Sequence, residues 1–176
     1  RLRHFAGALI RTVEKMFCQI LPALLAGLLC SAPPSLSTDL VGYVERVHDG
    51  DTFTLNGNKI RLWGVDAPEL AQQCTRGKRE KVACGTVARD ALRTMVRGEK
   101  VVCTQVERDR YKRIVATCQV GGRDVGELMV RSGNALKYQR YSGGRYQRAE
   151  RAAQDRRAGV WAGEFTEPWR WRRQKG

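Results

Sequence analysis

The sequence predicts an α+β fold that is mainly β, with five short strands and three helices. Three observations lead to this prediction. Runs rich in β-branched and aromatic residues, bounded by turn signals, occur three times before the first helical segment and twice after it. Apolar residues recur at helical spacing in three other segments. Strands in this order, with one helix inserted among them, are typical of a five-stranded OB-fold barrel.

The first three predicted strands share a high content of β-forming residues and lie at 41–47, 52–55 and 59–65. The run Asn56-Gly57-Asn58 is a strong signal for a hairpin turn between the second and the third strand. Because side chains alternate along a strand, Ile60 and Leu62 fall on one face, and Arg61 and Trp63 on the other. An arginine in mid-strand, away from the apolar face, is a candidate for function.

Several carboxylates are expected at the open end of this hairpin. A turn centred on its glycine pairs residues whose numbers sum to about 114, so that Asp51 faces Trp63 and Asp66 lies beyond Asp49. Glu69 follows directly. Carboxylates gathered at one rim repel each other unless a cation lies between them, and oxygen-only ligands favour Ca²⁺ or Mg²⁺. The simpler alternative is a turn with solvated aspartates.

The rest of the chain alternates strands and helices. Strands are predicted at 100–106 and 114–120, and helices at 86–97, 124–132 and 145–157. Asp124 and Glu127 stand at capping-box spacing where the second helix begins. Residues 70–84 are predicted to form a polar loop. Trp161 is expected to pack on the domain.

Four cysteines lie outside the N-terminal segment, and an even number in an exported domain suggests two disulfides. Zinc is the alternative, but the sequence contains no Cys-x-x-Cys. Three pairings are possible. A hairpin whose turn is centred on 110–111 puts Cys103 opposite Cys118, which leaves Cys74 to pair with Cys84.

The 176 residues carry a formal net charge of +14 and have a sequence pI of about 10.1, so the chain should attract polyanions, above all nucleic acid. Residues 1–38 begin with basic residues, continue with the apolar run 20–29 and end with small and turn-forming residues. This order is typical of a secretory signal peptide. The residues after it include 28 basic and 17 acidic ones, a net charge of +11. We therefore expect a secreted or periplasmic protein with a basic domain. A generic basic surface is the alternative interpretation.

Two arginines and a glutamate could act together with the carboxylates. Arg61, in mid-strand, and Arg113, just after the second hairpin turn, could bind phosphate oxygens bidentately and neutralise charge that develops on phosphorus. Glu69 could orient or deprotonate a water molecule. The alternatives are a salt bridge for Arg61 and a solvated turn position for Arg113. No P-loop, dinucleotide fingerprint or Gly-x-Ser-x-Gly motif is present, which argues against those enzyme classes.

Five segments of the sequence resemble the staphylococcal nuclease-like (thermonuclease) family. They are Asp49-Gly50-Asp51-Thr52, the run from Arg61 to Glu69, the run from Asp109 to Arg113, the run from Leu128 to Ala135, and Gly159-Val160-Trp161. The match covers about residues 41–163. We therefore expect a leader at 1–38, a domain of this family at 40–163 and a basic Trp/Arg tail at 164–176.

The resemblance implies an OB-fold barrel with three helices and a Ca²⁺-dependent phosphodiesterase that acts on DNA and RNA and leaves 3′-phosphate ends. Asp51 and Asp66 match the calcium-binding aspartates of the family. Ala67 falls where the family offers a backbone carbonyl to the metal. No stable protein partner is implied, no membrane is expected after removal of the leader, and a monomer is expected.

The resemblance also implies roles for five other residues. Glu69 matches the general base, and Arg61 and Arg113 match the arginines that grip the scissile phosphate. Arg110 and Tyr111 match turn residues that contact the nucleotide. The alternative function is a non-catalytic OB-fold module that binds nucleic acid.

Three features depart from the family pattern. Lys112 replaces the glycine that is usual in the second turn, which bears on how Arg113 is presented. The loop at 74–84 and the tail Trp169-Arg170-Trp171-Arg172-Arg173 extend beyond the pattern. The tail could stack bases and bind phosphate, or it could cap an edge of the core.

Overall fold

The computed structural model describes residues 39–77 and 79–175. The predicted leader therefore lies outside the described residues. Within the described part, every helix is too short or too polar to cross a membrane.

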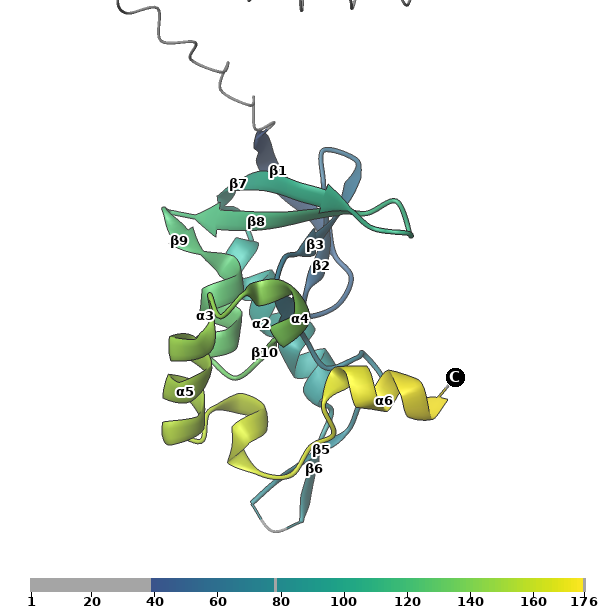
Figure 1. Cartoon of the computed structure of the whole chain (residues 1–176), viewed down its shortest axis with the longest axis vertical. Coiled ribbons are helices and arrows are strands. Elements are labelled where there is room, and N and C mark those ends of the chain that lie inside the picture. The colour runs from purple at the N-terminus through teal and green to yellow at the C-terminus, as the bar shows by residue number, and fades with distance from the viewer. Residues whose placement is uncertain (1–38, 78, 176) are drawn as a thin grey trace, which may run out of the picture. The chain divides into compact units, whose positions relative to one another are not determined.

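Five strands form a closed barrel, as predicted. They are β1 (Asp39–Val47), β2 (Thr52–Leu55), β3 (Asn58–Leu62), β7 (Lys100–Arg108) and β8 (Ile114–Val120). Their order in the sheet is β3-β2-β1-β7-β8, and a parallel pairing between β3 and β8 closes the barrel (Figure 1). A short strand, β9 (Arg123–Asp124), extends the β8 edge. The prediction of an α+β protein built on an OB-type barrel is confirmed.

The register of the first hairpin differs by one residue from the prediction. Thr52 pairs with Arg61, so partner numbers sum to 113 and the backbone oxygen of Asp51 accepts from the N–H of Leu62, not of Trp63. The cause is the turn, in which Asn56 and Gly57 both have positive φ, 49° and 72°. Such a two-residue turn is centred between two residues rather than on one.

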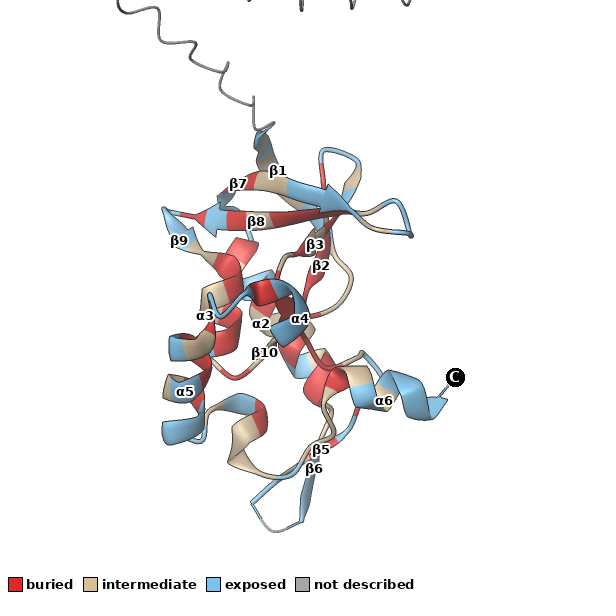
Figure 2. Ribbon diagram, viewed as in Figure 1, coloured by how far each residue is buried: buried red, intermediate tan, exposed pale blue. Residues whose placement is uncertain are grey.

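The barrel interior is filled from the inward faces of the strands and from one side of the inserted helix. Phe53, Leu55 and Ile60 are fully buried, as are Leu92 of the helix and Met129 of the next helix (Figure 2). Burial alternates along β3, with Ile60 and Leu62 inside and Arg61 half-buried on the outer face. The alternation predicted for this strand is therefore confirmed.

The three predicted helices, α2 (Cys84–Val96), α3 (Val125–Arg131) and α5 (Gln147–Asp155), are present, and three further helical segments accompany them. These are α4 (Gln139–Ser142), the 3₁₀ turn η1 (Gly159–Ala162) and α6 (Pro168–Lys175). Asp124 caps α3, since its carboxylate accepts from the N–H of Glu127 at 3.0 Å. The tail thus contains a helix that the sequence analysis left without a structure.

The segment predicted as a polar loop contains a small hairpin of two strands, β5 (Cys74–Arg76) and β6 (Glu80–Val82). Both predicted disulfides are present, Cys74–Cys84 and Cys103–Cys118, and the second joins directly paired residues of β7 and β8. Two further short strands, β4 (Val65–Asp66) and β10 (Leu136–Lys137), pair with each other.

A second, smaller apolar cluster lies around the first disulfide. Cys74, Cys84, Leu136 and Val160 are buried there, and the partly buried rings of Trp161, Phe165 and Trp169 pack against them. The expectation that Trp161 packs on the domain is confirmed. Trp169 ties the start of α6 to the same cluster, so this part of the tail caps an edge of the core.

Candidate nuclease site

Asp51 is held at the barrel rim by a tight turn. Its N–H donates to Asp49 Oδ1 at 3.0 Å. A side chain on Gly50 would begin 2.6 Å from Cβ of Ala67 and 2.7 Å from Cβ of Ala88, closer than real contacts allow. The glycine therefore lets the turn pack between the Asp66-Ala67 segment and α2. As a result, Asp51 is 3% exposed and points into the structure.

Arg61 bridges the two aspartates that the resemblance singles out. Its Nη1 lies 2.5 Å from Asp51 Oδ1, and its Nη2 lies 2.9 Å from Asp66 Oδ1. Asp51 Oδ2 accepts from the N–H of Ala67 at 3.1 Å, and Thr52 Oγ1 donates to Asp51 Oδ1 at 2.9 Å. The outer face of β3 and the short strand β4 thus bring these groups together. The salt bridge that the sequence analysis weighed for Arg61 is present.

The two aspartates differ in their electrostatic surroundings. Burial raises the pKa of Asp51, but the Arg61 guanidinium and the hydrogen bonds from Ala67 and Thr52 outweigh it and leave that pKa below its ordinary value. Burial also raises the pKa of Asp66, and there the bonds from its arginine neighbours do not fully offset it. Burial lowers the pKa of Arg61, but both aspartates raise it further above its ordinary value. Arg61 therefore stays charged.

Asp49 lies beside Asp51 at the open end of the hairpin. Burial and the neighbouring Asp51 carboxylate raise the pKa of Asp49 to about 7, while its own oxygen is used to hold the turn. Across residues 39–77 and 79–175, no group of three or more His, Cys, Asp or Glu side chains converges so that it could hold a metal ion. The expected carboxylates do meet at this end of the hairpin, since Asp49 contacts Asp51 and Arg61 joins Asp51 to Asp66. The donors that remain, two buried carboxylates, are still of the type that hard cations prefer.

The positive charge between the carboxylates comes instead from arginine. Besides Arg61, Arg172 of α6 reaches the same place, with Nη1 3.0 Å from Asp66 Oδ1 and Nη2 2.8 Å from Asp66 Oδ2. The Nη1 of Arg172 also lies 2.6 Å from Glu69 Oε1. Burial lowers the pKa of Arg172, but its bonds to Asp66 and Glu69 raise it above the ordinary value. Asp66 and Glu69 are thus joined by one guanidinium.

Two residues that the sequence analysis did not select fix the backbone at Glu69. The fully buried Gln72 accepts from the N–H of Glu69 at 3.2 Å and donates to the carbonyl oxygen of Thr166 at 2.6 Å. A Cβ on Gly85, in the first turn of α2, would lie 1.7 Å from the carbonyl oxygen of Glu69. The loop that carries Glu69 therefore needs a glycine at the helix start and a glutamine that ties it to the C-terminal segment.

The second hairpin turn presents Arg113 in an ordered way. Asp109 accepts from the Arg113 Nε at 2.7 Å and from its backbone N–H at 3.0 Å, and it also accepts from the N–H of Tyr111. Burial raises the pKa of Asp109, but these bonds lower it below its ordinary value. Lys112 has a φ of 63°, the left-handed conformation that a glycine would adopt without strain. The lysine therefore keeps the turn that the family builds with glycine.

Strand pairing puts Arg113 on the same face of the barrel as Arg61. Arg61 pairs with Val115 in the parallel β3–β8 contact, and Arg113 lies two residues before Val115. Paired residues share a face, and so do residues two apart along a strand. Arg113 bonds to Asp109 rather than to Asp51, Asp66 or Glu69. Arg110 and Tyr111 lie at the exposed tip of this turn, with the guanidinium 4.8 Å from the ring centre.

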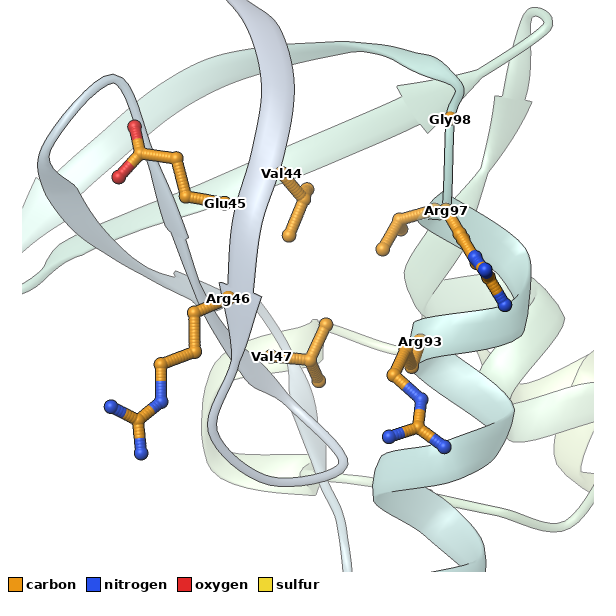
Figure 3. A pocket seen from close by; sticks show the side chains of 8 residues that line it. Val44, Glu45, Arg46, Val47, Arg93, Arg97 and Gly98 are labelled. Carbon is orange, nitrogen blue, oxygen red and sulfur yellow. The ribbon is translucent and has the colours of Figure 1, made fainter.

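A hollow of about 620 Å³ lies elsewhere, between β1 and α2. In Figure 3, Val44 and Val47 of β1 point toward the helix that carries Arg93 and Arg97. None of the predicted site residues lines this hollow. This hollow is therefore separate from the candidate site, in which Asp51 and Asp66 are buried and Arg172 and Glu69 are partly exposed.

The sequence signals for the missed residues were weak. Trp169 and Arg172 are three residues apart in α6 and so share a face of the helix. That spacing predicts that the two side chains share a face of the helix, but it does not predict which part of the domain this face packs against. Gln72 lies in irregular chain, where neither strand nor helix spacing gives its side chain a direction, and Gly85 begins α2 with no side chain that a pattern could single out.

Comparisons with known proteins agree with this geometry. The family model described as "Staphylococcal nuclease homologue" matches residues 59–163. The chain is 33% identical over 141 residues to the "Succinoglycan biosynthesis protein ExoI" of Rhizobium meliloti, a match that covers 79% of this chain and 73% of that protein. It is 32% identical over 149 residues to an Escherichia coli protein named "Uncharacterized endonuclease", with 81% and 91% covered.

A plant protein named as a nuclease of this family is also similar to the chain, over a smaller share of its own length. The "Staphylococcal-like nuclease CAN1" of Arabidopsis thaliana is 35% identical over 123 residues, which cover 66% of this chain and 34% of that protein. Members of the family are generally metal-dependent. By the family model and by these relatives, the chain belongs to the family of staphylococcal nuclease homologues, a family of nucleases.

Proposed function

We propose that this nuclease is calcium-dependent and sequence-non-specific, and that it hydrolyses phosphodiester bonds of DNA and RNA to leave 3′-phosphate ends. One observation carries the proposal. Arg61 lies within 2.9 Å of two buried aspartates at the barrel rim, and Glu69 is linked to one of them through a shared guanidinium. Carboxylates of this kind, next to an arginine on an open basic surface, suit a phosphate with a hard cation.

Asp51 and Asp66 would hold Ca²⁺ together with the backbone carbonyl of Ala67. When bound, the ion would polarise a phosphate oxygen and offset negative charge at phosphorus. The donor set supports this assignment, because Asp51 and Asp66 offer carboxylate oxygens side by side and hard cations prefer oxygen ligands. Both carboxylates are buried, with Asp66 fully covered and Asp51 3% exposed, so that an ion bound there is shielded from solvent.

Glu69 would act as the general base. It takes a proton from water, whose oxygen attacks phosphorus in line with the 5′ oxygen of the leaving group. The bond from phosphorus to that oxygen breaks, and the oxygen takes up a proton, which leaves a 3′-phosphate and a 5′-hydroxyl. Arg61 and Arg113 would bind the non-bridging oxygens of the phosphate, since they share one face of the barrel. Arg110 and Tyr111 would contact the nucleotide.

Plasmid digestion with Ca²⁺, and with a chelator in its place, tests the calcium requirement and the activity together. We expect cleavage with Ca²⁺, none with the chelator, and 3′-phosphate ends that resist extension by a polymerase until they are dephosphorylated. The variant Glu69→Gln should cleave on the order of 10²-fold more slowly, because it cannot accept the proton. Undiminished cleavage by this variant would refute the role of Glu69. Binding of DNA without cleavage would favour the non-catalytic module instead.

We further propose that the domain is exported, to the periplasm or outside the cell, and acts there as a monomer. Its two disulfides support this, because such bonds persist in oxidising compartments. N-terminal sequencing of the exported protein would find a start near residue 38 if the leader is removed. Recovery of the intact chain from the reducing cytoplasm, with free thiols, would contradict the proposal.

A further inference from the structure

The helix α6 inserts a cation into the candidate site from the far end of the chain. Its Arg172 binds both carboxylate oxygens of Asp66, at 3.0 and 2.8 Å, and one oxygen of Glu69 at 2.6 Å. The Asp66 side chain is fully buried, whereas that of Arg172 is 40% exposed. The two partners lie 106 residues apart in the sequence. The contact is therefore a tertiary one, which the folded domain makes on its own surface.

Arg172 uses the oxygen atoms that a metal ion would need. Asp66 Oδ1 accepts from both Arg61 and Arg172, and Asp66 Oδ2 accepts from Arg172. The carboxylate oxygens of Asp51 already accept hydrogen bonds from Arg61, from the hydroxyl of Thr52 and from the N–H of Ala67. Arg61 and Arg172 together take both lone-pair directions of Asp66 Oδ1, and the Arg172 guanidinium also lies 2.8 Å from Asp66 Oδ2, where its charge repels a divalent cation. An ion that binds Asp66 therefore competes with Arg172 for the same carboxylate.

The contact can open without disturbing the barrel. At the start of α6, Pro168 is buried and Trp169 packs against the second apolar cluster, with its ring 5.7 Å from that of Tyr138. The helix beyond Trp171 is exposed. The partly exposed Arg172 side chain can thus rotate away from Asp66 while Trp169 stays docked. Arg61, in contrast, is fixed within a paired strand.

We propose that Arg172 is an intramolecular competitor for the metal, so that the C-terminal helix sets how tightly the site binds Ca²⁺. This inference rests on the proposed calcium site at Asp51 and Asp66. By linkage, the metal and Arg172 weaken each other's binding to Asp66 by the same factor. Metal binding then releases the Arg172 guanidinium, which lies next to the exposed Arg173 on α6 and can meet a polyanion.

Calorimetric titration of the full chain with Ca²⁺, at an ionic strength of about 0.15 M and without substrate, tests the proposal. Arg172→Ala should bind Ca²⁺ about 10- to 100-fold more tightly than the unaltered chain, within the range of ordinary coupling between sites. Arg172→Lys, which keeps the charge but loses the bidentate fork, should fall between the two. Arg173→Ala is the matched control: it removes the same charge from an exposed neighbour, and its affinity should change by less than about threefold, as expected for a screened charge.

Equal or weaker binding of Ca²⁺ by Arg172→Ala, relative to the unaltered chain, would overturn the competition. In that case cleavage that still requires Ca²⁺ would leave the proposed function standing. If neither protein binds Ca²⁺ in the millimolar range, the calcium site and the competition both fail. Arg172→Gln, compared by circular dichroism, serves as a second variant should the alanine protein fold poorly.

Discussion

Arg61 and Arg172 bind the same aspartate from two very different regions of the molecule. Arg61 is anchored in mid-strand in the barrel wall, where its side chain is 18% exposed and pairs with both Asp51 and Asp66. Arg172 comes from a peripheral helix and is 40% exposed. The barrel thus supplies a cation that cannot leave without unfolding the rim, and the tail supplies one that can. Arg61 and Arg172 therefore differ in role, although both bind Asp66 at hydrogen-bond distances of 2.8–3.0 Å.

The two regions also differ in what orders them. The barrel half of the site, Asp51 and Arg61, is placed by strand register and a tight turn. The half around Glu69 lies in irregular chain and depends on side-chain bonds from Gln72, on the space left by Gly85, and on a nearby disulfide. Three experiments sharpen this contrast.

The largest effect is expected from Arg61→Ala. Removing this guanidinium leaves Asp51 buried without its partner, which should lower the free energy of unfolding by about 3–5 kcal/mol. It also removes a group proposed to bind the phosphate, so kcat/KM should fall about 10³-fold. Arg172→Ala should lower stability by less than about 1 kcal/mol, since that pair is partly exposed to solvent. Urea unfolding and plasmid cleavage measure the two quantities.

The control for this experiment is Arg61→Lys, which restores the charge without the fork that spans both aspartates. It should recover part of the stability and little of the activity. If Arg61→Ala and Arg172→Ala cost the same stability, the distinction between a fixed and a releasable cation is wrong.

The sequence predicted the barrel half of the site far better than the other half. Strand alternation gave the outward face of Arg61, and the hairpin signal put Asp51 opposite Trp63, two residues from Arg61, because both follow from regular geometry. The register was one residue off, since Asn56 and Gly57 form a two-residue turn. Arg172 could not be predicted, because the irregular chain between η1 and α6 carries no periodicity that fixes where the helix packs. Gln72 was missed for the same reason.

The two disulfides allow a matched test, one in each region. Cys103→Ala/Cys118→Ala opens the barrel bridge, and Cys74→Ala/Cys84→Ala opens the bridge next to the Glu69 loop. The closed segments are similar, with sequence separations of 15 and 10 residues, so each removal should cost about 3 kcal/mol by loop entropy. Activity of the folded protein should fall, by about tenfold, in the second variant, because a misplaced catalytic group slows the reaction.

Chemical denaturation gives the stabilities, and cleavage rates measured well below the unfolding transition give the activities. Tm values of both variants, compared with that of the unaltered protein under reducing conditions, provide the control. An activity loss confined to the barrel variant would contradict the idea that the Glu69 loop needs outside support.

The smallest effect is expected from a residue of the barrel region whose backbone is in the left-handed conformation. Lys112 has a φ of 63° in the turn that presents Arg113, and Arg157, just after α5, has a φ of 50°. Left-handed backbone costs a residue with a side chain about 1–2 kcal/mol, but glycine also has more freedom to lose on folding, so each change to glycine should stabilise by about 0.5–1 kcal/mol. If the carboxylate of Asp109 orders Arg113, and the lysine backbone does not, Lys112→Gly should gain this stability and keep its full kcat/KM. Arg157→Gly, far from the turn, is the control and is expected to behave in the same way. A rise in Tm together with weakened cleavage in Lys112→Gly alone would mean that the rigidity of the lysine, and not the carboxylate of Asp109, presents the arginine to the phosphate.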